Sequence, residues 1–533
     1  MSQLLTDEIG QAFEITQESD TRLDEKTSLY SNINIVNNIT KFLSSSFGPC
    51  GMDKILQSKD DEITVTNDGA TILNEMDMSN NPISRLIVQL SESQDNEIGD
   101  GTTGVVILAN AMLQQSKALL EKGIHPIRIA EIFNKCLNLT CNHLDKISEN
   151  IKNINETMLC AAKTSLNSKI VSKSIDKFSK ICVDAVLSVA DLKRKDVDFD
   201  LIHFETKTGN NVDDTTLIKG MVIKKEFSHP QMVKEFKNAK VALLACPFEP
   251  PKLKNKHNLL ITNKNEFNEL AKYEKENFLE MIKSLKKANV DVVLCQWGFD
   301  DEANSLLMEN NLPAVRWVGG NDLGLIAVHI NACIISRFED LSSGDLGIAN
   351  IKEITLGTEN EKFIVIENNN KKKAVTIIVK GGNDMIIAEA KRSLQDGLFA
   401  VRNVLKDEKI VYGGGSSEIS CSLFLEEESK KEFGENEVVM LAFSRALEEI
   451  PIVLAQNSGL DALQKLTYLR KKQLETKKYY FGVDCLGNNE ENMKKLNIFD
   501  TLCSKKTQVQ MATQLVERIL KIDSIISSEN KTY

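Results

Sequence analysis

The sequence has no apolar stretch of about 18 residues, the length at which a helix can cross a membrane, so we expect no membrane span. Residues 1–8 are polar and acidic and lack the basic start and apolar run of a signal peptide. No block of lysine and arginine forms a basic stripe, and the net charge is −11. Nucleic acid is therefore disfavoured as a partner, because its phosphates repel an acidic surface.

Patterns typical of metal sites and disulfides are missing as well. The chain has 11 cysteines, but they are scattered and none belongs to a Cys-x-x-Cys pair. Cys136, Cys141 and His143 are close enough in sequence to suggest metal ligands. Cys136, however, shares the apolar stripe of a predicted helix, which favours a place in the core. So many free thiols indicate a reducing compartment, and we expect a cytoplasmic protein.

The signatures of several enzyme classes are also absent. The sequence contains no Gly-x-x-x-x-Gly-Lys-Ser/Thr phosphate loop and no protein-kinase motif set. It has no Gly-x-Ser-x-Gly turn either, so nothing in it supports a serine hydrolase. Any catalytic site must therefore be built from less common motifs.

The chain of 533 residues is too long for one core and predicts about three domains. Helical patterns occupy 32–147 and the part that follows Gly382, whereas the centre alternates apolar strands with helices. The buried strands are predicted at 241–246, 290–295, 314–318 and 374–379. Two helical regions that flank an α/β centre predict one discontinuous helical domain built from both ends of the chain.

Several elements can be predicted more closely. In the first helical region we predict a helix over 32–46 and helices over 105–122 and 126–147. We also predict a hairpin in the segment 63–69, where Asn67-Asp68-Gly69 is the turn signal. In the centre, a helix over 267–288 is rich in lysine and glutamate. Its composition favours a solvated face, with a mobile protrusion as the alternative.

Residues 99–104 read Gly-Asp-Gly-Thr-Thr-Gly and precede the apolar run 105–109. This order predicts a turn at a helix start, where unpaired N–H groups and the helix dipole favour a phosphate. Asp100 adds a hard oxygen ligand of the kind that Mg²⁺ prefers. By itself the turn is weak evidence, because most such turns have only a structural role.

Four other segments have chemistry that a nucleotide site needs. Turns at Gly48-Pro49-x-Gly51 and Gly413-Gly414-Gly415 allow close approach of the backbone, and Asp68 lies on a tight turn. Asp396 lies near the apolar face of a predicted helix, where a carboxylate is usually a boundary residue. The residues themselves therefore allow a Mg-nucleotide site on a split helical domain and no more specific conclusion.

In this order and spacing, the segments resemble the group II chaperonins over nearly the whole chain. The motifs that carry the resemblance are 65–73 (VTNDGATIL), 99–104 (GDGTTG), 163–169 (KTSLNSK), 411–415 (VYGGG) and 482–485 (GVDC). Further segments resemble one particular subunit type of the hetero-oligomeric chaperonin of the eukaryotic cytosol: 93–98 (SQDNEI), 123–128 (GIHPIR), 226–232 (EFSHPQM), 296–304 (QWGFDDEAN) and 316–320 (RWVGG).

The resemblance implies a multi-domain α+β chaperonin fold with three domains. A mainly helical equatorial ATPase domain would comprise 1–148 and 405–533. A small α/β intermediate hinge domain would comprise 149–218 and 373–404, and an α/β apical substrate-binding domain would cover 219–372.

Within that apical domain, the resemblance implies a helical lid protrusion near 248–283. This expectation replaces the solvated helix that the charge pattern alone favours for 267–288.

The resemblance also implies ATP and Mg²⁺ as cofactors and assigns roles to individual residues. Asp100 would bind Mg²⁺, Asp68 would support the metal and its waters, and Asp396 would orient or deprotonate the attacking water. Ser168 and Lys169 match a loop that senses the γ-phosphate. The implied nucleotide-binding residues are Gly48, Pro49, Gly101, Thr102, Thr103, Gly104, Ser168, Lys169, Gly414, Gly415, Asp484 and Asp500.

Asp484 is implied for the ribose hydroxyls, and Asp500 replaces a glutamate of the family on the adenine side. Gly397 stands beside Asp396 where the family usually has alanine, which we expect to loosen that helix by about 1 kcal/mol.

The partners implied by the resemblance are seven paralogous subunits in a hetero-oligomeric double ring and non-native client proteins such as actin and tubulin. ATP hydrolysis would drive lid closure and folding of the client. One alternative is a ring-structural or free adaptor subunit with little ATP turnover, which the intact Asp100 and Asp396 disfavour. The other alternative is a homo-oligomeric chaperonin of archaeal type.

Overall fold

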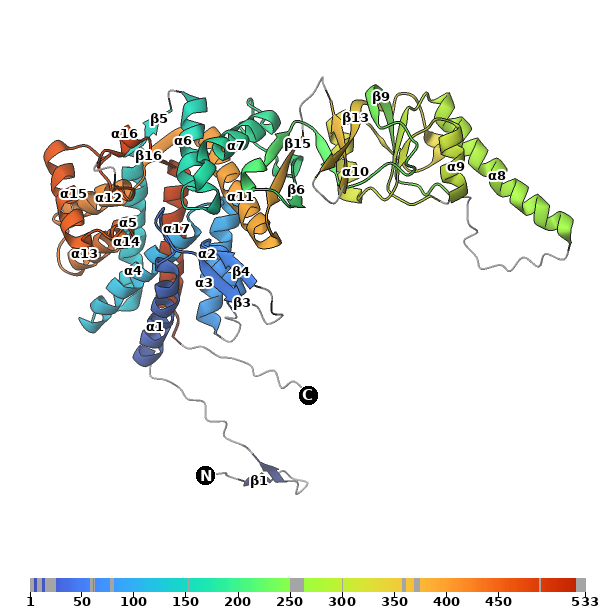
Figure 1. Cartoon of the computed structure of the whole chain (residues 1–533). Coiled ribbons are helices and arrows are strands. Elements are labelled where there is room, and N and C mark those ends of the chain that lie inside the picture. The colour runs from blue at the N-terminus through green and yellow to red at the C-terminus, as the bar shows by residue number, and fades with distance from the viewer. Residues whose placement is uncertain are drawn as a thin grey trace. The chain divides into compact units, whose positions relative to one another are not determined.

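The computed structural model describes residues 4–6, 12–14, 25–57, 61, 63–76, 81–151, 153–249, 263–299, 301–356, 361–368, 374–487 and 490–523. The chain forms two compact units (Figure 1), one made of 1–150 with 409–533 and the other of 151–408. The first unit therefore contains both ends of the chain. Among the described helices, none is long and apolar enough to span a membrane.

The first unit is mainly helical. Its helices are α1 (Glu25–Ser44), α2 (Gly69–Glu75), α3 (Pro82–Glu97), α4 (Thr102–Glu121), α5 (Pro126–Ile147), α12 (Ser416–Ser429), α13 (Glu435–Leu447), α14 (Glu449–Asn457), α15 (Ala462–Thr476), α16 (Met493–Leu496) and α17 (Leu502–Leu520). Its short strands are β1 (Leu4–Thr6), β2 (Ala12–Glu14), β3 (Lys54–Gln57), β4 (Ile63–Thr66), β5 (Glu149–Asn150), β16 (Lys409–Tyr412) and β17 (Phe499–Thr501).

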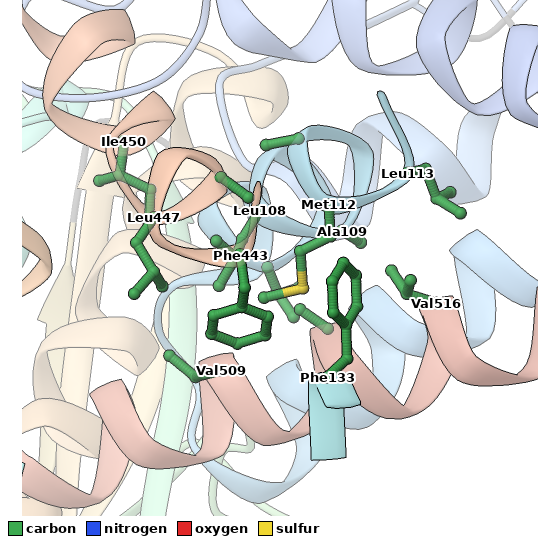
Figure 2. Close-up of a cluster of buried hydrophobic side chains, with 14 of the residues drawn as sticks. Leu108, Ala109, Met112, Leu113, Phe133, Phe443, Leu447, Ile450, Val509 and Val516 are labelled. Carbon is green, nitrogen blue, oxygen red and sulfur yellow. The ribbon is translucent and has the colours of Figure 1, made fainter. Parts of the chain in front are cut away.

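Helix α4 lies at the centre of the first unit. Its first eight residues are small or apolar and all are buried, so the helix packs against neighbours on several sides, among them α1, α13 and α17. Figure 2 shows Leu108 and Met112 of α4 among side chains of α5, α13 and α17. Phe133 of α5 and Phe443 of α13 meet edge to face there, with ring centroids 5.2 Å apart. One continuous core therefore joins the two halves of the chain.

The two halves also share a small sheet. Strand β16 pairs antiparallel with β17 on one side, where Val411 lies opposite Asp500. On its other side it pairs with β5, where Ile410 lies opposite Glu149. Backbone hydrogen bonds thus tie the segment before residue 151 to the segment after residue 408.

Most local predictions for the first unit are confirmed. The helices predicted over 105–122 and 126–147 are α4 and α5, and the helix predicted over 32–46 is α1, which begins earlier, at Glu25. The hairpin exists as β3 and β4, but the prediction that Asn67-Asp68-Gly69 supplies a hairpin turn is wrong. These residues start α2, because an aspartate that favours a turn can equally cap a helix.

The second unit combines two sheets with helices. Its helices are α6 (Ile154–Leu166), η1 (Ile170–Ser174), α7 (Ile175–Val189), η2 (Phe199–Leu201), η3 (Val212–Asp214), α8 (Lys264–Lys287), α9 (Asp301–Glu309), α10 (Gly320–Ile330), η4 (Phe338–Asp340) and α11 (Asp384–Asp407). Its strands are β6 (Ile202–Thr208), β7 (Thr216–Ile218), β8 (Met221–Ile223), β9 (Glu235–Leu244), β10 (Val292–Cys295), β11 (Ala314–Val315), β12 (Ile334–Ile335), β13 (Gly347–Leu356), β14 (Glu361–Glu367) and β15 (Val375–Gly381).

The larger sheet has the order β11-β10-β9-β13-β14-β8, and β12 pairs with β9. Strands β9, β10, β11 and β12 run parallel, as expected of an α/β unit. The strands predicted at 241–246, 290–295 and 314–318 are β9, β10 and β11. The strand predicted at 374–379 is β15, which belongs to the smaller sheet β6-β15-β7. Helices α6, α7 and α11 and the smaller sheet share a second core in this unit.

The charged helix predicted over 267–288 is α8 (Lys264–Lys287). Its described side chains from 264 to 276 are exposed, whereas Phe278, Ile282 and Leu285 are buried against the larger sheet's core. Only the last part of α8 is therefore packed. Of the expected protrusion near 248–283, residues 250–262 lie outside the described residues, so the protrusion stays a prediction.

The core of the first unit makes a specific prediction about stability. Phe443→Ala should lower the free energy of unfolding by about 3–5 kcal/mol, because the buried ring leaves a cavity beside Phe133. The measurement is urea unfolding followed by circular dichroism. Phe433→Ala is the matched control, since that ring is 88% exposed and its loss should change stability by less than about 0.5 kcal/mol. Equal effects of both substitutions would contradict this packing.

Candidate functional site

The starts of helices α2 and α4 lie against each other. Asp68 caps α2, because its Oδ2 accepts hydrogen bonds from the backbone N–H of Thr71 at 3.0 Å and from the Thr71 hydroxyl at 2.8 Å. Its Oδ1 accepts a hydrogen bond from the hydroxyl of Thr102, the first residue of α4, at 2.9 Å. A Cβ atom on Gly69 would lie 2.6 Å from Thr103 Oγ1, so this close approach requires glycine. The amino ends of α2 and α4, where the helix dipoles are positive, thus lie side by side.

Asp100 and Gly101 form the turn that leads into α4. Gly101 is the N-cap residue with a φ of 80° and offers no side-chain acceptor. The cap residue therefore supplies no acceptor to the N–H groups of the first helical turn, as at helix starts that bind anions. The Gly101 N–H donates to Asp100 Oδ1 at 2.7 Å, and Gln94 Nε2 donates to the Asp100 carbonyl at 2.8 Å. These contacts hold the turn in a defined shape.

The Gly48-Pro49 turn is attached to residues far away in the sequence. Asn457, the last residue of α14, donates to the Phe47 carbonyl at 2.7 Å across 410 residues. The Cys50 thiol donates to the Cys485 carbonyl at 3.2 Å. A Cβ atom on Gly104 would lie 3.4 Å from the Phe47 ring, so the turn also adjoins the start of α4. The turn therefore lies close to the segment that contains Asp484 and to the start of α4.

The glycine turn before α12 rests on α14 as well. Gly415 is the N-cap residue with a φ of 73°, and a Cβ atom there would lie 2.8 Å from Pro451 Cβ. The Gly414 carbonyl accepts a hydrogen bond from the Val483 N–H at 2.8 Å, which joins the turn to the residue before Asp484. Helix α14 therefore contacts both predicted glycine turns, one through Asn457 and one through Pro451.

Asp484 carries an unusual oxygen. Its side chain is only 6% exposed, and its Oδ1 accepts the Leu486 N–H at 3.1 Å. Its Oδ2 is buried and has no hydrogen-bond partner among the described residues. Leaving such an oxygen without a partner is costly, and a hydroxyl donor from a ligand would satisfy it. The residue therefore fits the sugar hydroxyls of a nucleotide.

Asp500 is engaged by a buried cation. Lys505 Nζ lies 3.2 Å from Asp500 Oδ2 and 2.7 Å from Glu418 Oε1. Burial alone would raise the pKa of Glu418, but the charge and hydrogen bond of Lys505 outweigh it, so the pKa lies below its ordinary value of 4.5. Both carboxylates serve to neutralise Lys505. Asp500 therefore has a structural partner besides any contact with a ligand.

The second unit contains the remaining predicted residues. Asp396 of α11 forms an ion pair with Lys169, with 2.7 Å between Oδ2 and Nζ, and the side chains are 17% and 10% exposed. The Ser168 hydroxyl lies 3.5 Å from the Ser165 carbonyl, which it contacts as a long hydrogen bond. The carboxylate of Asp396 is thus held in one orientation by a cation that is itself mostly buried.

Gly397, beside Asp396, allows close helix packing. A Cβ atom there would lie 3.0 Å from Cys182 Sγ and 3.3 Å from Leu166 Cδ2. Gly397 therefore lets α11 approach α6 and α7 closely, and the expected loosening of α11 stays a prediction.

The predicted residues fall into two groups. The first unit contains Gly48, Pro49, Asp68, Asp100, Gly101, Thr102, Thr103, Gly104, Gly414, Gly415, Asp484 and Asp500. The second contains Ser168, Lys169 and Asp396. Contacts of Asp68, Phe47 and α14 connect most members of the first group, which can offer helix N–H groups to an anion and a carboxylate to hydroxyls. A phosphorylated nucleoside with its Mg²⁺ fits this donor set.

Sequence reasoning missed the residues that hold this group together. Asn457 and Pro451 of α14 contact the two glycine turns, yet neither belongs to a recognisable motif. Gln508 of α17 is a third example, because its side chain covers Gly104. Their roles come from segments that meet only after folding, so no local pattern could have identified them.

Comparisons with known proteins give a consistent result. A profile of the TCP-1/cpn60 chaperonin family matches residues 39–530. The chain is 60% identical over 528 residues to T-complex protein 1 subunit epsilon of Encephalitozoon cuniculi, with 99% of each chain covered. It is 35% identical to thermosome subunit alpha of Aeropyrum pernix, covering 96% of this chain and 93% of that one. It is 36% identical to thermosome subunit alpha of Archaeoglobus fulgidus, covering 97% and 94%.

Two glutamates of α12 allow a matched test of the buried cation. Glu418→Gln should lower the free energy of unfolding by about 3 kcal/mol at neutral pH, because it removes a carboxylate from buried Lys505. Glu428→Gln removes the carboxylate that pairs with exposed Lys431, and it should change the free energy of unfolding by less than about 1 kcal/mol. Urea unfolding measures both.

The effect of Glu418→Gln should depend on pH with a defined sign. Because folding lowers the pKa of Glu418, its stabilising effect is complete above the ordinary value of 4.5 and is lost as the pH falls below it. The difference between the wild type and Glu418→Gln should therefore shrink in acid. A difference that stays constant from neutral pH into acid would refute the ion-pair origin of the effect.

Proposed function

The chain belongs to the TCP-1/cpn60 chaperonin family, and on this premise we propose that it is an ATP-hydrolysing subunit of a hetero-oligomeric protein-folding ring. The observation that carries the proposal is the buried Oδ2 of Asp484, for which the described residues offer no hydrogen-bond donor, in a unit that also joins two helix starts through Asp68. A buried carboxylate oxygen without a donor costs free energy, and a hydroxyl of a bound nucleotide would offset that cost.

The helix starts supply the proposed phosphate site. The N–H groups at the start of α4 and the hydroxyls of Thr102 and Thr103 would receive the phosphates of ATP. Asp100, and Asp68 beside it, would hold Mg²⁺, whose charge offsets that of the phosphates and of the leaving group. Asp68 already orients the Thr102 hydroxyl, so this part of the site is organised before a ligand binds.

The proposed nucleoside site lies at the other end of the same group. The Gly48-Pro49 turn and the turn at Gly414 and Gly415 would allow close approach of the sugar and base, because their backbones carry little side-chain bulk. Asp484 would accept hydrogen bonds from the ribose hydroxyls. Asp500 would contribute on the adenine side while still paired with Lys505.

Asp396 is the proposed water-orienting carboxylate. Its ion pair with Lys169 supports this role, because the cation holds the carboxylate in one orientation, from which it could position a water. Ser168 and Lys169 would respond to the γ-phosphate. Because Asp396 belongs to the second unit, we propose that hydrolysis follows a closing movement of domains, which would couple turnover to folding of a client.

The proposed domains follow the family resemblance. Residues 1–148 and 405–533 would form the equatorial ATPase domain, 149–218 and 373–404 the intermediate domain, and 219–372 the apical domain. Seven paralogous subunits, a cytoplasmic location and non-native clients complete the proposal. The match to a subunit named T-complex protein 1 epsilon supports a hetero-oligomer over a homo-oligomeric ring, although the thermosome subunits are also relatives.

Substitution of Asp396 tests the proposed turnover. Asp396→Asn and Asp396→Ala should lower the rate of ATP hydrolysis at least about hundredfold while Mg-ATP still binds, because only the water loses its base. Asp384→Ala is the control, since this exposed carboxylate lies on the same helix, α11. Phosphate release and nucleotide binding would be measured on the assembled protein. Unchanged turnover in both Asp396 variants would show that Asp396 has no part in hydrolysis. Negligible turnover of the wild type would favour the alternative of an adaptor subunit that hardly hydrolyses ATP.

Substitution of Asp484 tests the proposed ribose contact. Asp484→Asn should weaken ATP binding about tenfold, because a hydroxyl loses a charged acceptor. It should bind 2′,3′-dideoxy-ATP as the wild type does, because that ligand has neither hydroxyl to donate. Isothermal titration calorimetry measures the four affinities. An equal loss for both ligands would mean that Asp484 acts on the fold and not on the ribose.

A further inference from the structure

A hollow of about 680 Å³ lies outside the larger sheet of the second unit and is lined in part by Glu249, Trp297, Phe299, Trp317 and Ser336. We call it the tryptophan pocket. Its lining follows the carboxyl ends of four parallel strands, β9, β10, β11 and β12, which end at Leu244, Cys295, Val315 and Ile335. The loops at this edge of a parallel sheet are where α/β proteins bind ligands.

Both tryptophans of the chain line this pocket, and both remain largely in contact with solvent. The chain contains 2 tryptophans, and Trp297 and Trp317 are 48% and 56% exposed. Burying an aromatic ring is favourable, so a ligand that covered these two exposed indoles would gain binding free energy. Neither the core nor the proposed nucleotide site explains them.

The structure holds the two rings in defined positions. The Trp297 indole N–H donates to the Ala245 carbonyl at 2.8 Å, which fixes the edge of the ring. The Trp317 ring lies over Gly298, where an added Cβ atom would come within 2.6 Å of Cζ2. Trp317 also has a φ of 58°, which a large side chain adopts only at a cost. Such strain is typical of residues kept for binding.

The chemistry of the lining indicates a cation. Aromatic faces attract positive charge through the ring quadrupole, and the Glu249 carboxylate in the same pocket adds an opposite charge. Among the described residues, no lysine or arginine stacks on either indole. Arg316 and Arg337 are neighbours in sequence but do not line the pocket. A net charge of −11 also favours the approach of basic chains.

We propose that the tryptophan pocket binds an arginine side chain of a basic polypeptide segment. The planar guanidinium would stack on an indole and donate hydrogen bonds to Glu249, a combination that a lysine ammonium matches less well. This binding site is separate from the proposed ATP site and does not depend on turnover. The sequence segments 296–304 and 316–320, which the proposed function leaves without a role, supply its aromatic residues.

Tryptophan fluorescence of the full-length chain reports directly on this pocket, because both indoles line it. A nine-residue peptide of glycine and serine with one central arginine should give a saturable change in emission. The same peptide with citrulline, which has the same shape without the charge, should bind about tenfold more weakly. Equal binding of the citrulline peptide, or tighter binding of a proline-rich peptide, would overturn the proposal.

Matched variants test the residues themselves. Glu249→Gln should weaken binding of the arginine peptide about fivefold or more, because the charged partner is lost. Gly298→Ala should also weaken it, because the new methyl group would displace the Trp317 ring. Glu276→Gln, an exposed glutamate of α8, is the control and should bind as the wild type does.

All three variants should retain the ATP turnover of the wild type, because none lies in the proposed nucleotide site. If the wild type hydrolyses ATP but does not bind the arginine peptide, only the proposed role of the tryptophan pocket is refuted. A chain without turnover that still binds the arginine peptide would refute only the ATPase. If Glu249→Gln and Glu276→Gln bind the peptide equally well, the proposed recognition of a cation is wrong.

Discussion

The candidate site in the first unit depends on the hydrogen bonds that the Asp68 carboxylate accepts. One oxygen caps α2, and the other accepts the Thr102 hydroxyl at the first residue of α4. Helix α4 is buried from its first residue, so its start cannot move independently of the core. The N–H groups that would meet an anion are therefore attached, through Asp68, to the buried centre of the unit. Pre-organisation of this kind lowers the cost of binding a charged ligand.

The same unit depends on joining the two ends of the chain. Strand β16 lies between β5 and β17, and α17 packs against α4 and α5. Hydrogen bonds such as those from Asn457 to the Phe47 carbonyl and from Cys50 to the Cys485 carbonyl close loops of more than 400 residues. The second unit is inserted between these ends and contains Asp396 with its partner Lys169. The proposed binding groups and the proposed catalytic base thus belong to different compact units.

The two proposed sites bind ligands of opposite charge, one at the amino ends of helices and the other at the carboxyl ends of strands. Helix starts present N–H groups and a positive dipole end, which suits phosphate at α2 and α4. The tryptophan pocket lies beyond the carboxyl ends of parallel strands, where rings and Glu249 suit a cation. In both places a glycine allows the close contact, Gly69 beneath Thr103 and Gly298 beneath Trp317. Small residues therefore set the geometry, while the charged or aromatic neighbours set the ligand class.

Local patterns predicted much of this architecture. The apolar periodicity located α4 and α5, and the apolar strands of the centre located the parallel sheet. The prediction failed at Asn67-Asp68-Gly69, because the same residues favour a hairpin turn and a helix cap, and only the chain that follows decides between them. Asn457 was missed because its partner is distant in sequence, and hydrogen bonds of this kind leave no periodic signal.

The sequence by itself determined the family, the types of element and the residues able to bind phosphate, metal or hydroxyl groups, because these properties come from local chemistry and characteristic spacing. Only the tertiary structure decided how those residues are used. The two contacts of Asp68, the burial of Asp484 Oδ2 and the exposure of Trp297 and Trp317 all depend on how distant segments pack. Burial sets the cost of an unpaired atom, and it is a property of the folded chain alone.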